Sequence, residues 1–426
     1  MNIQIPRGTQ DILPGEVEIW QYIEDKAKDV CRRYNYHEIR TPIFEHTDLF
    51  LRGVGDTTDI VQKEMYTFED RGSRSLTLRP EGTAAVVRSY VEKKMFGQAA
   101  QPLKLFYIGP MFRYERPQSG RMRQFVQFGV EALGSADPAI DAEVLALVMS
   151  MYAELGLTNV KLVLNSLGDK ESRDAHRQAL IDHFKGSIGE FCGDCQGRLE
   201  KNPLRILDCK KDHDHPLMKN APSILDYLNE ESNTYFEHVK AYLDQLNIPY
   251  VVDPTLVRGL DYYTHTAFEI MADGDGFGAI TTLCGGGRYS GLVEQLGGPA
   301  TPGIGFAFSI ERVIMALKAQ GKVTSKENGI DCYLVSLGDE AKKKNVELLY
   351  QLRLAGLSAD MDYLDKKMKA QFKAADRLSA RYAAILGEDE LAKGFINVKN
   401  METGTQEEIK LDTLITYMKE QIQGGK

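Results

Sequence analysis

The chain has 426 residues and a net charge of −9, with 52 Lys and Arg against 61 Asp and Glu. Its 43% hydrophobic and 27% charged residues, with 38 Gly and 15 Pro, are typical of globular domains and exclude a collagen-like, low-complexity or disordered chain. The acidic balance provides no general attraction for nucleic acid, so such a partner must be held by local basic patches. A chain of this length is expected to form two or three domains.

The six cysteines are expected to be reduced thiols rather than a secreted disulfide framework, because the chain is large and does not begin with a basic segment followed by an apolar run. No uncharged apolar stretch reaches the length that a membrane-spanning helix needs. We therefore expect a cytoplasmic protein without a membrane partner.

The N-terminal part begins with a predicted helix at 16–35, whose apolar residues recur at helical intervals. An extended stretch at 36–44 follows it. An alternating run at 75–80 is predicted to be a strand, and it leads through Glu81, Gly82 and Thr83 into a helix at 84–94.

The strongest strand signal is a long hairpin formed by 103–115 and 124–133, joined by an arginine-rich loop. Residues of the second strand alternate between two chemically distinct faces. One face carries Val126, Phe128, Val130 and Ala132, and the other carries Phe125, Gln127, Gly129 and Glu131. The first face is expected to pack against the core, and the second to contact a polar ligand.

A helix at 140–155 and a strand at 160–164 precede a mostly helical, charged insertion at 170–247. Strands are predicted again at 262–271 and 279–283. The glycine-rich stretches at 274–278 and 285–291 are interpreted as tight turns and close-packed backbone. A strand at 303–308 then leads into a helix capped by Ser309.

A polar segment at 318–329 is the predicted linker to a separate C-terminal domain. Beyond it, extended and helical segments alternate, which favours an α/β unit with a parallel or mixed sheet. We expect a catalytic domain at 1–325, interrupted by the insertion at 170–247, and an α/β domain at 328–426.

The hairpin loop is rich in arginine and is opposed only by Glu115; its cations are Arg113, Arg116, Arg121 and Arg123. A solvated loop is the ordinary explanation of such a charge run. However, Arg113 ends a strand whose partner presents Phe125 and Gln127 on one face. Arginine binds phosphate through paired hydrogen bonds, and an aromatic ring offers a stacking surface for a base. The loop therefore predicts a nucleotide-phosphate site.

Two further arginines add to this prediction. Arg258 begins a strand beside Gly259, which permits close approach of the backbone to a ligand, although a single arginine there would ordinarily be a salt-bridged structural residue. Arg312 lies in the first turn of a helix, where the helix dipole disfavours a cation by about 0.3–1 kcal/mol. This placement indicates an anion in front of Arg312; the alternatives are a side chain turned to solvent or paired with Glu311.

The chain lacks a Gly-x-x-x-x-Gly-Lys-[Ser/Thr] loop, which excludes a P-loop nucleotidase, and its glycine runs do not match a Rossmann fingerprint. Ligand types and spacing compatible with a tetrahedral zinc site occur in the insertion, at Cys192, Cys195, Cys209 and His213. Reduced thiols in a helical insertion explain these residues equally well, and no open catalytic metal site is predicted.

A basic stripe is predicted on a helix at 366–380, because cations recur there every three or four residues. Its members are Lys366, Lys369, Lys373, Arg377 and Arg381. Solvated side chains are the default interpretation, and contact with an RNA backbone is the competing hypothesis.

Several motifs resemble class II aminoacyl-tRNA synthetases, and specifically bacterial-type histidyl-tRNA synthetases. They lie at 6–11 (PRGTQD), 77–83 (TLRPEGT), 112–118 (FRYERPQ), 256–263 (LVRGLDYY), which resembles the family's histidine signature, and 303–312. The resemblance covers the whole chain. It implies an α+β fold with an antiparallel β-sheet flanked by helices, a homodimer formed through the segment around Pro42, a helical insertion, and a C-terminal α/β anticodon-binding domain.

The resemblance implies ATP-dependent ligation of L-histidine to tRNA(His) through a histidyl-adenylate, with Mg²⁺ as cofactor and release of AMP and diphosphate. Arg113 would hold the α-phosphate of ATP, and Phe125 would stack on adenine. Arg121 and Arg312 would grip the outer phosphates with Mg²⁺, and Glu115 would belong to the same ATP site.

The resemblance also assigns the amino-acid and tRNA sites. Glu81, Thr83 and Gln127 would bind the α-amino group of histidine. The imidazole would contact Glu131, Tyr262, Tyr263 and Tyr289. Arg258 would bridge the carboxylate and the α-phosphate, as a catalytic residue together with Arg113. The tRNA would be met by Gln118, Arg123, Lys369, Lys373 and Arg377.

One alternative is the histidine-sensing regulatory subunit of ATP phosphoribosyltransferase, a relative of this family that keeps the catalytic fold but lacks the anticodon domain. The retained arginines and the C-terminal domain favour the enzyme. A protein that only binds tRNA would leave Gln127 and Glu131 unexplained.

Overall fold

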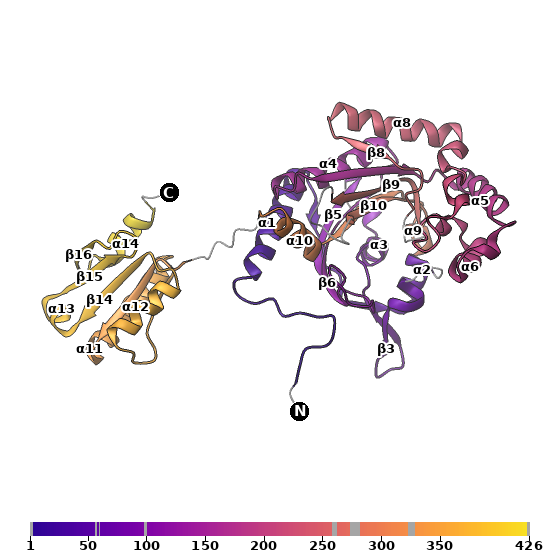
Figure 1. Cartoon of the computed structure of the whole chain (residues 1–426). Helices are drawn as coiled ribbons and strands as arrows, with labels where there is room; N and C mark the ends of the chain where they lie inside the picture. The colour runs from indigo at the N-terminus through magenta and orange to yellow at the C-terminus, as the bar shows by residue number, and fades with distance from the viewer. Residues whose placement is uncertain are drawn as a thin grey trace. The chain divides into compact units, whose positions relative to one another are not determined.

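The computed structural model describes residues 3–55, 58, 60–97, 100–257, 262–272, 282–322 and 329–423 (Figure 1). The chain divides into two compact units, Met1–Thr324 and Ser325–Lys426. Each unit has its own sheet and its own hydrophobic core.

An eight-stranded sheet is the frame of the first unit. Its strands follow the order β1 (His37–Glu38), β5 (Leu103–Phe112), β6 (Gln124–Leu133), β11 (Gly303–Ser309), β10 (Thr282–Tyr289), β9 (Tyr263–Ala272), β7 (Val160–Ser166) and β8 (Tyr250–Val252). The pairs from β5 to β7 are antiparallel, whereas β1 with β5 and β7 with β8 are parallel edge pairs. The predicted antiparallel sheet is therefore confirmed, with a parallel strand added at each edge.

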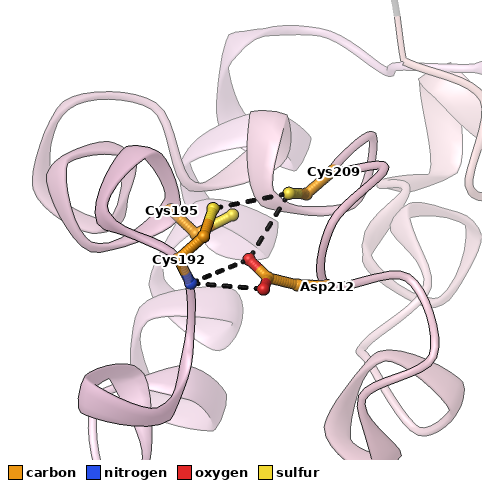
Figure 2. Close-up of side chains that lie close together, drawn as sticks. All are labelled: Cys192, Cys195, Cys209 and Asp212. Carbon is orange, nitrogen blue, oxygen red and sulfur yellow. Dashed lines mark hydrogen bonds between the residues drawn. The ribbon is translucent and has the colours of Figure 1, made fainter.

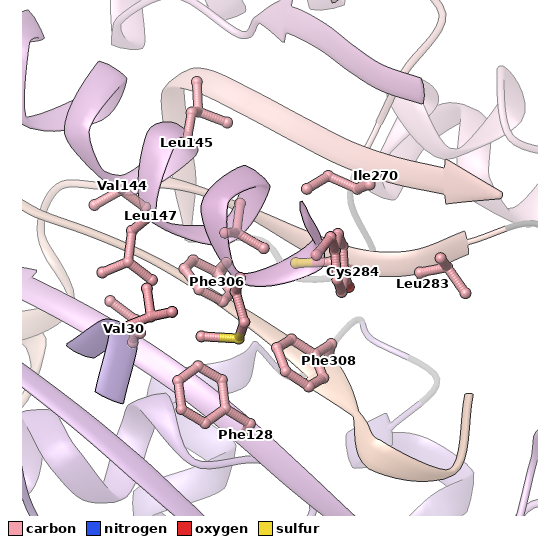
Figure 3. Packing of buried hydrophobic residues seen from close by; sticks show 14 of the residues in the cluster. Val30, Phe128, Val144, Leu145, Leu147, Ile270, Leu283, Cys284, Phe306 and Phe308 are labelled. Carbon is pink, nitrogen blue, oxygen red and sulfur yellow. The ribbon is translucent and has the colours of Figure 1, made fainter. Parts of the chain in front are cut away.

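Helices cover one face of this sheet. They include α1 (Val17–Arg33), α4 (Pro138–Glu154) and α10 (Ile310–Ala319). Two residues fix the start of helix α4. The Asp137 side chain caps the helix by accepting a hydrogen bond from the Ala139 amide at 2.9 Å, and Pro138 occupies the first helical position. Phe128, Phe306 and Phe308 from adjacent strands pack with these helices in the main core (Figure 3).

Shorter elements cover the opposite face. Helix α3 (Thr83–Glu92) packs there with α9 (Leu292–Gln295), and η2 (Met95–Gly97) follows α3. Beside them, α2 (Thr47–Val54) and the π-helical turn η1 (Ile60–Glu64) adjoin a three-stranded sheet. That sheet has the order β2 (Phe44–His46), β4 (Ser75–Leu78) and β3 (Tyr66–Glu69).

The helical segment between β7 and β8 has a small core of its own. It comprises α5 (Lys170–Phe184), η3 (Ile188–Glu190), α6 (Gly193–Lys201), η4 (Pro203–Ile206), α7 (Pro216–Lys219), η5 (Ile224–Tyr227) and α8 (Glu230–Gln245). Helix α8 contributes Phe236, Val239 and Leu243 to the main core and packs against α4. The separate small core therefore lies in the part of the segment before α8.

A buried ion pair links α4 to the sheet. The Arg288 guanidinium on β10 donates to Asp141 on α4 at 3.0 Å, and both residues are almost fully buried. Thr266 and Tyr235 also donate to the Asp141 carboxylate, at 2.6 and 3.1 Å. Breaking a buried pair of this kind by removing one partner costs about 3–5 kcal/mol, because the other charge is left uncompensated.

Two predicted segments differ in the structure. Gly285–Gly287 do not form turns but lie inside strand β10, where a Cβ at Gly286 would come within 2.3 Å of the Gly305 carbonyl oxygen and 2.7 Å of Phe268. Glycine is used there because the space above the strand is already filled. The predicted linker begins too early, since α10 continues to Ala319. Residues 274–278 lie outside the described residues.

The second unit is an α/β domain with a mixed sheet. Its strand order is β13 (Ala359–Met361), β12 (Cys332–Leu337), β14 (Tyr382–Gly387), β15 (Phe395–Asn400) and β16 (Gln406–Lys410). The first three strands are parallel to one another, β15 is antiparallel to β14, and β16 is antiparallel to β15. Its helices are α11 (Asp339–Leu354), α12 (Met368–Arg377), α13 (Glu388–Lys393) and α14 (Leu414–Gln423). Within the described ranges, no helix has the length and apolar character needed to cross a membrane.

Candidate active site

Polar side chains from three elements meet on the sheet face that α3 covers. Glu81 and Thr83 lie at the start of α3, Gln127 and Glu131 come from β6, and Tyr289 comes from β10. All five are buried. Burying so many polar groups is costly unless they are hydrogen-bonded or kept for a ligand. The structure thus brings together five of the residues that the sequence predicted to bind histidine.

Glu131 lies at the centre of this polar pocket. Its carboxylate accepts hydrogen bonds from the Thr83 hydroxyl at 2.6 Å and from the Tyr289 hydroxyl at 2.7 Å. Burial raises the pKa of Glu131 to about 8, with a further rise from the Glu81 charge, although the two hydrogen bonds act in the opposite direction. A buried carboxyl whose pKa is raised this far is a candidate functional group.

Glu81 is held by the first turn of α3. Its two carboxylate oxygens accept hydrogen bonds from the amides of Thr83 at 2.7 Å and Ala84 at 2.8 Å. Burial raises the pKa of Glu81, while these amides and the charge of Arg113 lower it in part. The positive end of the helix dipole also favours a carboxylate at this position. The side chain of Glu81 is therefore buried and held in a fixed orientation at the start of α3.

Tyr107 on β5 is a pocket residue that sequence reasoning missed. Its hydroxyl donates to the Gln127 side-chain oxygen at 3.4 Å. Its ring occupies the space above Gly82 and Gly129, where an added Cβ would meet the ring at 2.2 Å in either case. The available signal was Gly129, a glycine inside a strand of otherwise large residues, because such a glycine marks the close approach of another group.

Glycines in β11 also make room for the pocket. A Cβ at Gly305 would lie 2.1 Å from the Glu131 carboxylate, and one at Gly303 would lie 2.3 Å from the Tyr289 ring. Both glycines belong to the motif at 303–312 on which the family resemblance rests. Their role is thus to leave space for Glu131 and Tyr289 on the neighbouring strands.

Three tyrosine rings pack together where β9 begins beside the end of β10. Tyr262 lies 4.7 Å from Tyr263 and 5.6 Å from Tyr289, measured between ring centroids. The carbonyl of Tyr263 accepts a hydrogen bond from Arg173 of α5 at 3.0 Å. Packed aromatic rings give a flat ligand a rigid, apolar surface with polar edges.

Arg113 connects the arginine-rich loop to the polar pocket. Its Nε donates to the Pro80 carbonyl at 2.8 Å, directly beside Glu81. Its guanidinium carbon lies 5.4 Å from the centroid of the Phe125 ring. The hydrogen bond through Nε orients the guanidinium; among the described residues its two terminal nitrogens donate no hydrogen bond and can bind an anion, with Glu115 4.0 Å from one of them.

Arg121 and Glu115 form a second part of this cationic region. The Nη1 atom of Arg121 lies 3.5 Å from Glu115 Oε2, and that oxygen is buried without a hydrogen-bond partner in the described structure. A buried carboxylate oxygen without a hydrogen-bond donor is available to a metal ion or another donor. The loop therefore combines cations with one oxygen ligand.

Arg312 is anchored from α10. It donates to the carbonyls of Gly120 at 3.0 Å and Thr282 at 2.8 Å. Burial lowers the pKa of Arg312, as do the charges of Arg121 and Arg113, and its bond to Gly120 places it against the hairpin loop that carries both of them. Pairing with Glu311, one of the alternatives from the sequence, is wrong, because the Glu311 oxygens accept from the Val126 amide at 2.8 Å and the Ser309 hydroxyl at 2.6 Å.

The remaining loop residues differ in their surroundings. Arg123 packs over the Tyr114 ring at 3.9 Å and donates to the Glu115 carbonyl at 3.2 Å, so it supports the loop. Gln118 is exposed at the turn, where its backbone pairs with Arg121. Arg258, the predicted bridge between carboxylate and α-phosphate, lies outside the described residues.

In the second unit, the predicted basic stripe falls on α12. Lys369, Lys373 and Arg377 are exposed on this helix, and in the described part of the chain none of them forms an ion pair. Lys366 precedes α12, where its amide donates to Asp362, and Arg381 follows it, 3.9 Å from Asp331. The helix is thus shorter than the predicted 366–380, and three of the five cations remain in a row upon it.

Arg113 is the structural link between the cationic region and the polar pocket. One side offers guanidinium groups, an aromatic ring and a carboxylate, which suit a nucleoside triphosphate. The other offers buried carboxylates, hydroxyls and tyrosine rings, which suit a small molecule with an amino group and a polar ring. The arrangement suits two different ligands on the two sides of Arg113.

Comparisons with known proteins show the family of the chain. A family model described as "Histidyl-tRNA synthetase" matches residues 8–313, and one described as "Anticodon binding domain" matches residues 331–421. The histidine–tRNA ligase of Halalkalibacterium halodurans is 74% identical over 425 residues, covering 100% of this chain and 99% of that protein. The histidine–tRNA ligase of Geobacillus sp. is 70% identical over 422 residues, covering 99% and 100%.

A solved structure is also similar along the whole chain. The apo S. aureus histidyl-tRNA synthetase is 54% identical, with a TM-score of 0.85, covering 98% of this chain and 100% of that one. The predicted resemblance is therefore confirmed in sequence and in fold. The chain belongs to the histidyl-tRNA synthetase family.

Proposed function

We propose that the protein ligates L-histidine to tRNA(His) in two steps at the site described above. In the first, a carboxylate oxygen of histidine bonds to the α-phosphorus of ATP, the bond to the bridging β-oxygen breaks, and diphosphate leaves. In the second, a hydroxyl of the terminal adenosine of the tRNA takes the histidyl group, and AMP leaves. The observation that carries the proposal is the buried Glu131, held between Thr83 and Tyr289, together with Arg113, which bonds the Pro80 carbonyl next to Glu81 and belongs to the same loop region as Arg121.

Histidine is proposed to bind in the polar pocket. Its α-amino group would contact Glu81, Thr83 and Gln127, which are buried and close to the start of α3. Its imidazole would bond to Glu131, with Tyr289, Tyr262 and Tyr263 around the ring. When histidine binds, Glu131 would exchange its hydrogen bond from Thr83 or from Tyr289 for one from the imidazole. The carboxylate would therefore keep its hydrogen-bond donors.

The first step needs positioning and charge stabilisation rather than a general base, because the attacking carboxylate is already ionised. Arg113, oriented by the Pro80 carbonyl, is proposed to stabilise the charge that develops at the α-phosphate. Phe125, beside Arg113, would stack on adenine. Arg121 and Arg312 would hold the outer phosphates. Arg258 remains a second proposed catalytic cation at the α-phosphate.

The cofactor proposed for this step is Mg²⁺. The residues fit it, because the buried Glu115 Oε2 lies among the phosphate-binding arginines without a hydrogen-bond donor, and Mg²⁺ prefers one or two carboxylates together with phosphate oxygens. When bound, the ion would neutralise phosphate charge. Glu115 would then exchange its contact with Arg121 for the metal and leave that guanidinium to the phosphates.

The domain roles follow from this assignment. Residues 1–325 are proposed to be the catalytic domain, with 170–247 as its insertion, and 328–426 to be the anticodon-binding domain. Such a protein would work in the cytoplasm, where ATP, histidine and tRNA are available. The regulatory-subunit alternative is not favoured, because the chain carries the anticodon-binding region at 331–421.

ATP–diphosphate exchange across the twenty amino acids tests the function. We expect exchange with histidine alone, because Glu131 and the surrounding tyrosines match the donor and acceptor of its ring. Histidine binding without exchange would instead support the histidine-sensing alternative, and exchange with another amino acid would overturn the assignment of the pocket. A tRNA-charging assay with tRNA(His) completes the test of the second step.

The basic stripe is proposed to bind the tRNA backbone. A double change of Lys369→Glu and Lys373→Glu should weaken tRNA charging at least tenfold at low salt, since each phosphate contact contributes to affinity and to its salt dependence. Histidine-dependent exchange should stay unchanged. The matched control is Lys343→Glu with Lys344→Glu on α11. Equal tRNA charging by the wild type, the α12 double variant and the α11 control would show that the stripe only faces solvent.

A homodimer is proposed to form through the segment around Pro42. The next residues, Ile43 and Phe44, are exposed, and Phe44 lies on the edge strand β2. Phe68 on β3 is exposed as well. Exposed apolar groups on the two edge strands of this small sheet favour association with another chain.

Phe44→Asp should convert the proposed dimer to monomers, because it places a charge among apolar groups at the contact. Sedimentation velocity would measure this change in mass. Tyr242→Asp, at an exposed tyrosine on α8, is the matched control and should leave the dimer intact. A wild-type protein that sediments as a monomer at micromolar concentration would contradict the proposal.

A further inference from the structure

Three cysteines and an aspartate converge in the helical segment between β7 and β8. The ligand atoms of Cys192, Cys195, Cys209 and Asp212 all lie within 4.8 Å of one another (Figure 2). In sequence they follow the pattern Cys-x2-Cys-x13-Cys-x2-Asp, two ligand pairs with the same short spacing. Paired ligands two residues apart are typical of structural zinc sites.

The distances match one tetrahedral ion. The Sγ atoms of Cys192 and Cys209 are 3.7 Å apart, and Cys209 Sγ is 3.4 Å from Asp212 Oδ2. With Zn–S bonds of about 2.3 Å and a Zn–O bond of about 2.0 Å, tetrahedral geometry separates two sulfurs by about 3.8 Å and a sulfur from an oxygen by about 3.5 Å. The sulfurs are too far apart for a disulfide, and the four ligand atoms are too close for a multi-iron cluster.

Local structure orients each ligand pair. Cys192 is the residue before α6 and Cys195 lies in the first turn of that helix. Cys209 follows η4, and its amide donates to the Ile206 carbonyl at 3.0 Å. The Cys192 amide donates to both oxygens of Asp212, at 3.2 and 3.1 Å, which holds the carboxylate toward the thiols. A hydrogen bond from a neighbouring group, such as this amide, fixes the orientation of a metal-binding carboxylate.

The ligand set differs from the one that the sequence predicted. His213 does not join the cluster: its Nδ1 bonds the Lys210 carbonyl at 3.0 Å, its Nε2 lies 3.2 Å from Asp214, and its side chain is exposed. Asp212, one residue earlier, occupies the fourth position instead. The x2 spacing of Cys209 and Asp212 repeats that of Cys192 and Cys195, although the second pair lies in a turn and not at the start of a helix.

We propose that Cys192, Cys195, Cys209 and Asp212 bind one structural zinc ion. Four protein ligands leave no open position for a substrate, which is the mark of a structural rather than a catalytic site. The ion would stabilise a small core, in which Cys195 and Cys209 are buried with Leu180, Phe184 and Phe191. A core of so few side chains gains much from a metal cross-link.

The site has a structural connection to the active site through α5. Leu180 and Phe184 near the end of this helix belong to the small core, and Arg173 near its start donates to the Tyr263 carbonyl at 3.0 Å. Zinc bound to the cluster would therefore stabilise α5, the helix that contacts Tyr263 beside the polar pocket.

Metal content of the full-length protein tests the proposal. The chain should be produced without an affinity tag that binds metal, purified under reducing conditions with zinc in the growth medium, and measured by mass spectrometry of the elements. We expect about one zinc per chain in the wild type and at least a fivefold loss in Cys209→Ser and Asp212→Ala. His213→Ala is the matched control and should keep the wild-type content.

Two measurements on the wild type keep the test independent of variants that fail to fold. Zinc release by a mercurial reagent, followed by cobalt loading, should give the visible absorption of tetrahedral cobalt with thiolate ligands. The thiols of the cluster should react slowly with a thiol reagent until the metal is released. A metal-free wild type, a disulfide among these cysteines in the reduced preparation, iron in place of zinc, or zinc lost in His213→Ala would each overturn the proposal.

Discussion

Replacing Glu131 by alanine should lower kcat/KM for histidine in the exchange reaction by more than a hundredfold while changing the KM for ATP only slightly. The change removes the carboxylate proposed to bind the imidazole and leaves the buried hydroxyls of Thr83 and Tyr289 without their acceptor. Each unsatisfied buried group costs about 1–3 kcal/mol, and a lost hydrogen bond to a charged group costs about 1.5–3 kcal/mol. Equal losses for histidine and ATP would indicate misfolding instead.

Glu131→Gln separates the ligand role of the carboxylate from its effect on stability. Glu131 has a pKa of about 8 in the folded chain against an ordinary value of 4.5, so the folded state binds more protons between these values. The stability that this group contributes is fully present below pH 4.5 and is lost as pH rises through about 8. Since one pKa unit corresponds to about 1.4 kcal/mol, the decline amounts to a few kcal/mol.

The glutamine variant does not ionise and should escape this decline. Its Tm relative to the wild type should therefore rise by a few degrees between about pH 5 and about pH 8.5, while its histidine activation stays at least tenfold below the wild type. Thermal unfolding at four pH values would measure the difference. Glu294→Gln, at an exposed glutamate on α9, is the control. If Tm varies with pH in the same way in both variants, Glu131 does not titrate as a buried group.

Arg113→Ala should slow histidine-dependent exchange by about 10²–10³, the cost of removing one preorganised group that stabilises developing charge. Its guanidinium is oriented by the Pro80 carbonyl and lies beside Phe125, and its terminal nitrogens have no other hydrogen-bond partner in the described structure. Arg113→Lys should not restore the rate, because a lysine cannot keep the contact to Pro80 and still present two donors to a phosphate.

Arg116→Ala is the matched control for this prediction, since Arg116 is an exposed arginine of the same loop. Its exchange rate should stay within about twofold of the wild type. A loss of the same size at both positions would show that the loop acts only through its net charge. Arg258→Ala is expected to match Arg113→Ala in size, since both cations are proposed to act at the α-phosphate.

Alternation along a single strand was enough to predict the hairpin and its two faces. Phe128 and Val130 are buried in the main core, whereas Gln127 and Glu131 lie on the pocket side, as the period of two requires. The hairpin register, with Gly129 opposite Tyr107, also explains why a glycine stands in the strand. That pairing, however, involves two segments of chain, and Tyr107 was not identified from either one alone.

Predictions that depended on one residue's immediate neighbours were less successful. Arg312 has partners in Gly120 and Thr282, far away in sequence, while Glu311 is used by Val126 and Ser309. The glycines at 285–287 are typical of a turn locally, but the crowding of β10 between β9 and β11 places them inside a strand. In the insertion, the sequence named His213 as the residue that joins the three cysteines, whereas Asp212 lies beside them in the structure.

The amino-acid sequence by itself determined the family, the two units, the main strands and the residue types of the site, because these depend on motifs and on periodicity within one segment. The tertiary structure alone decided which of those residues meet. Strand order places β6 beside β11 and β11 beside β10, which brings Glu131 to Tyr289 and leaves Gly305 between them. Contacts of this kind are set by packing and strand pairing between distant segments, which no local pattern encodes.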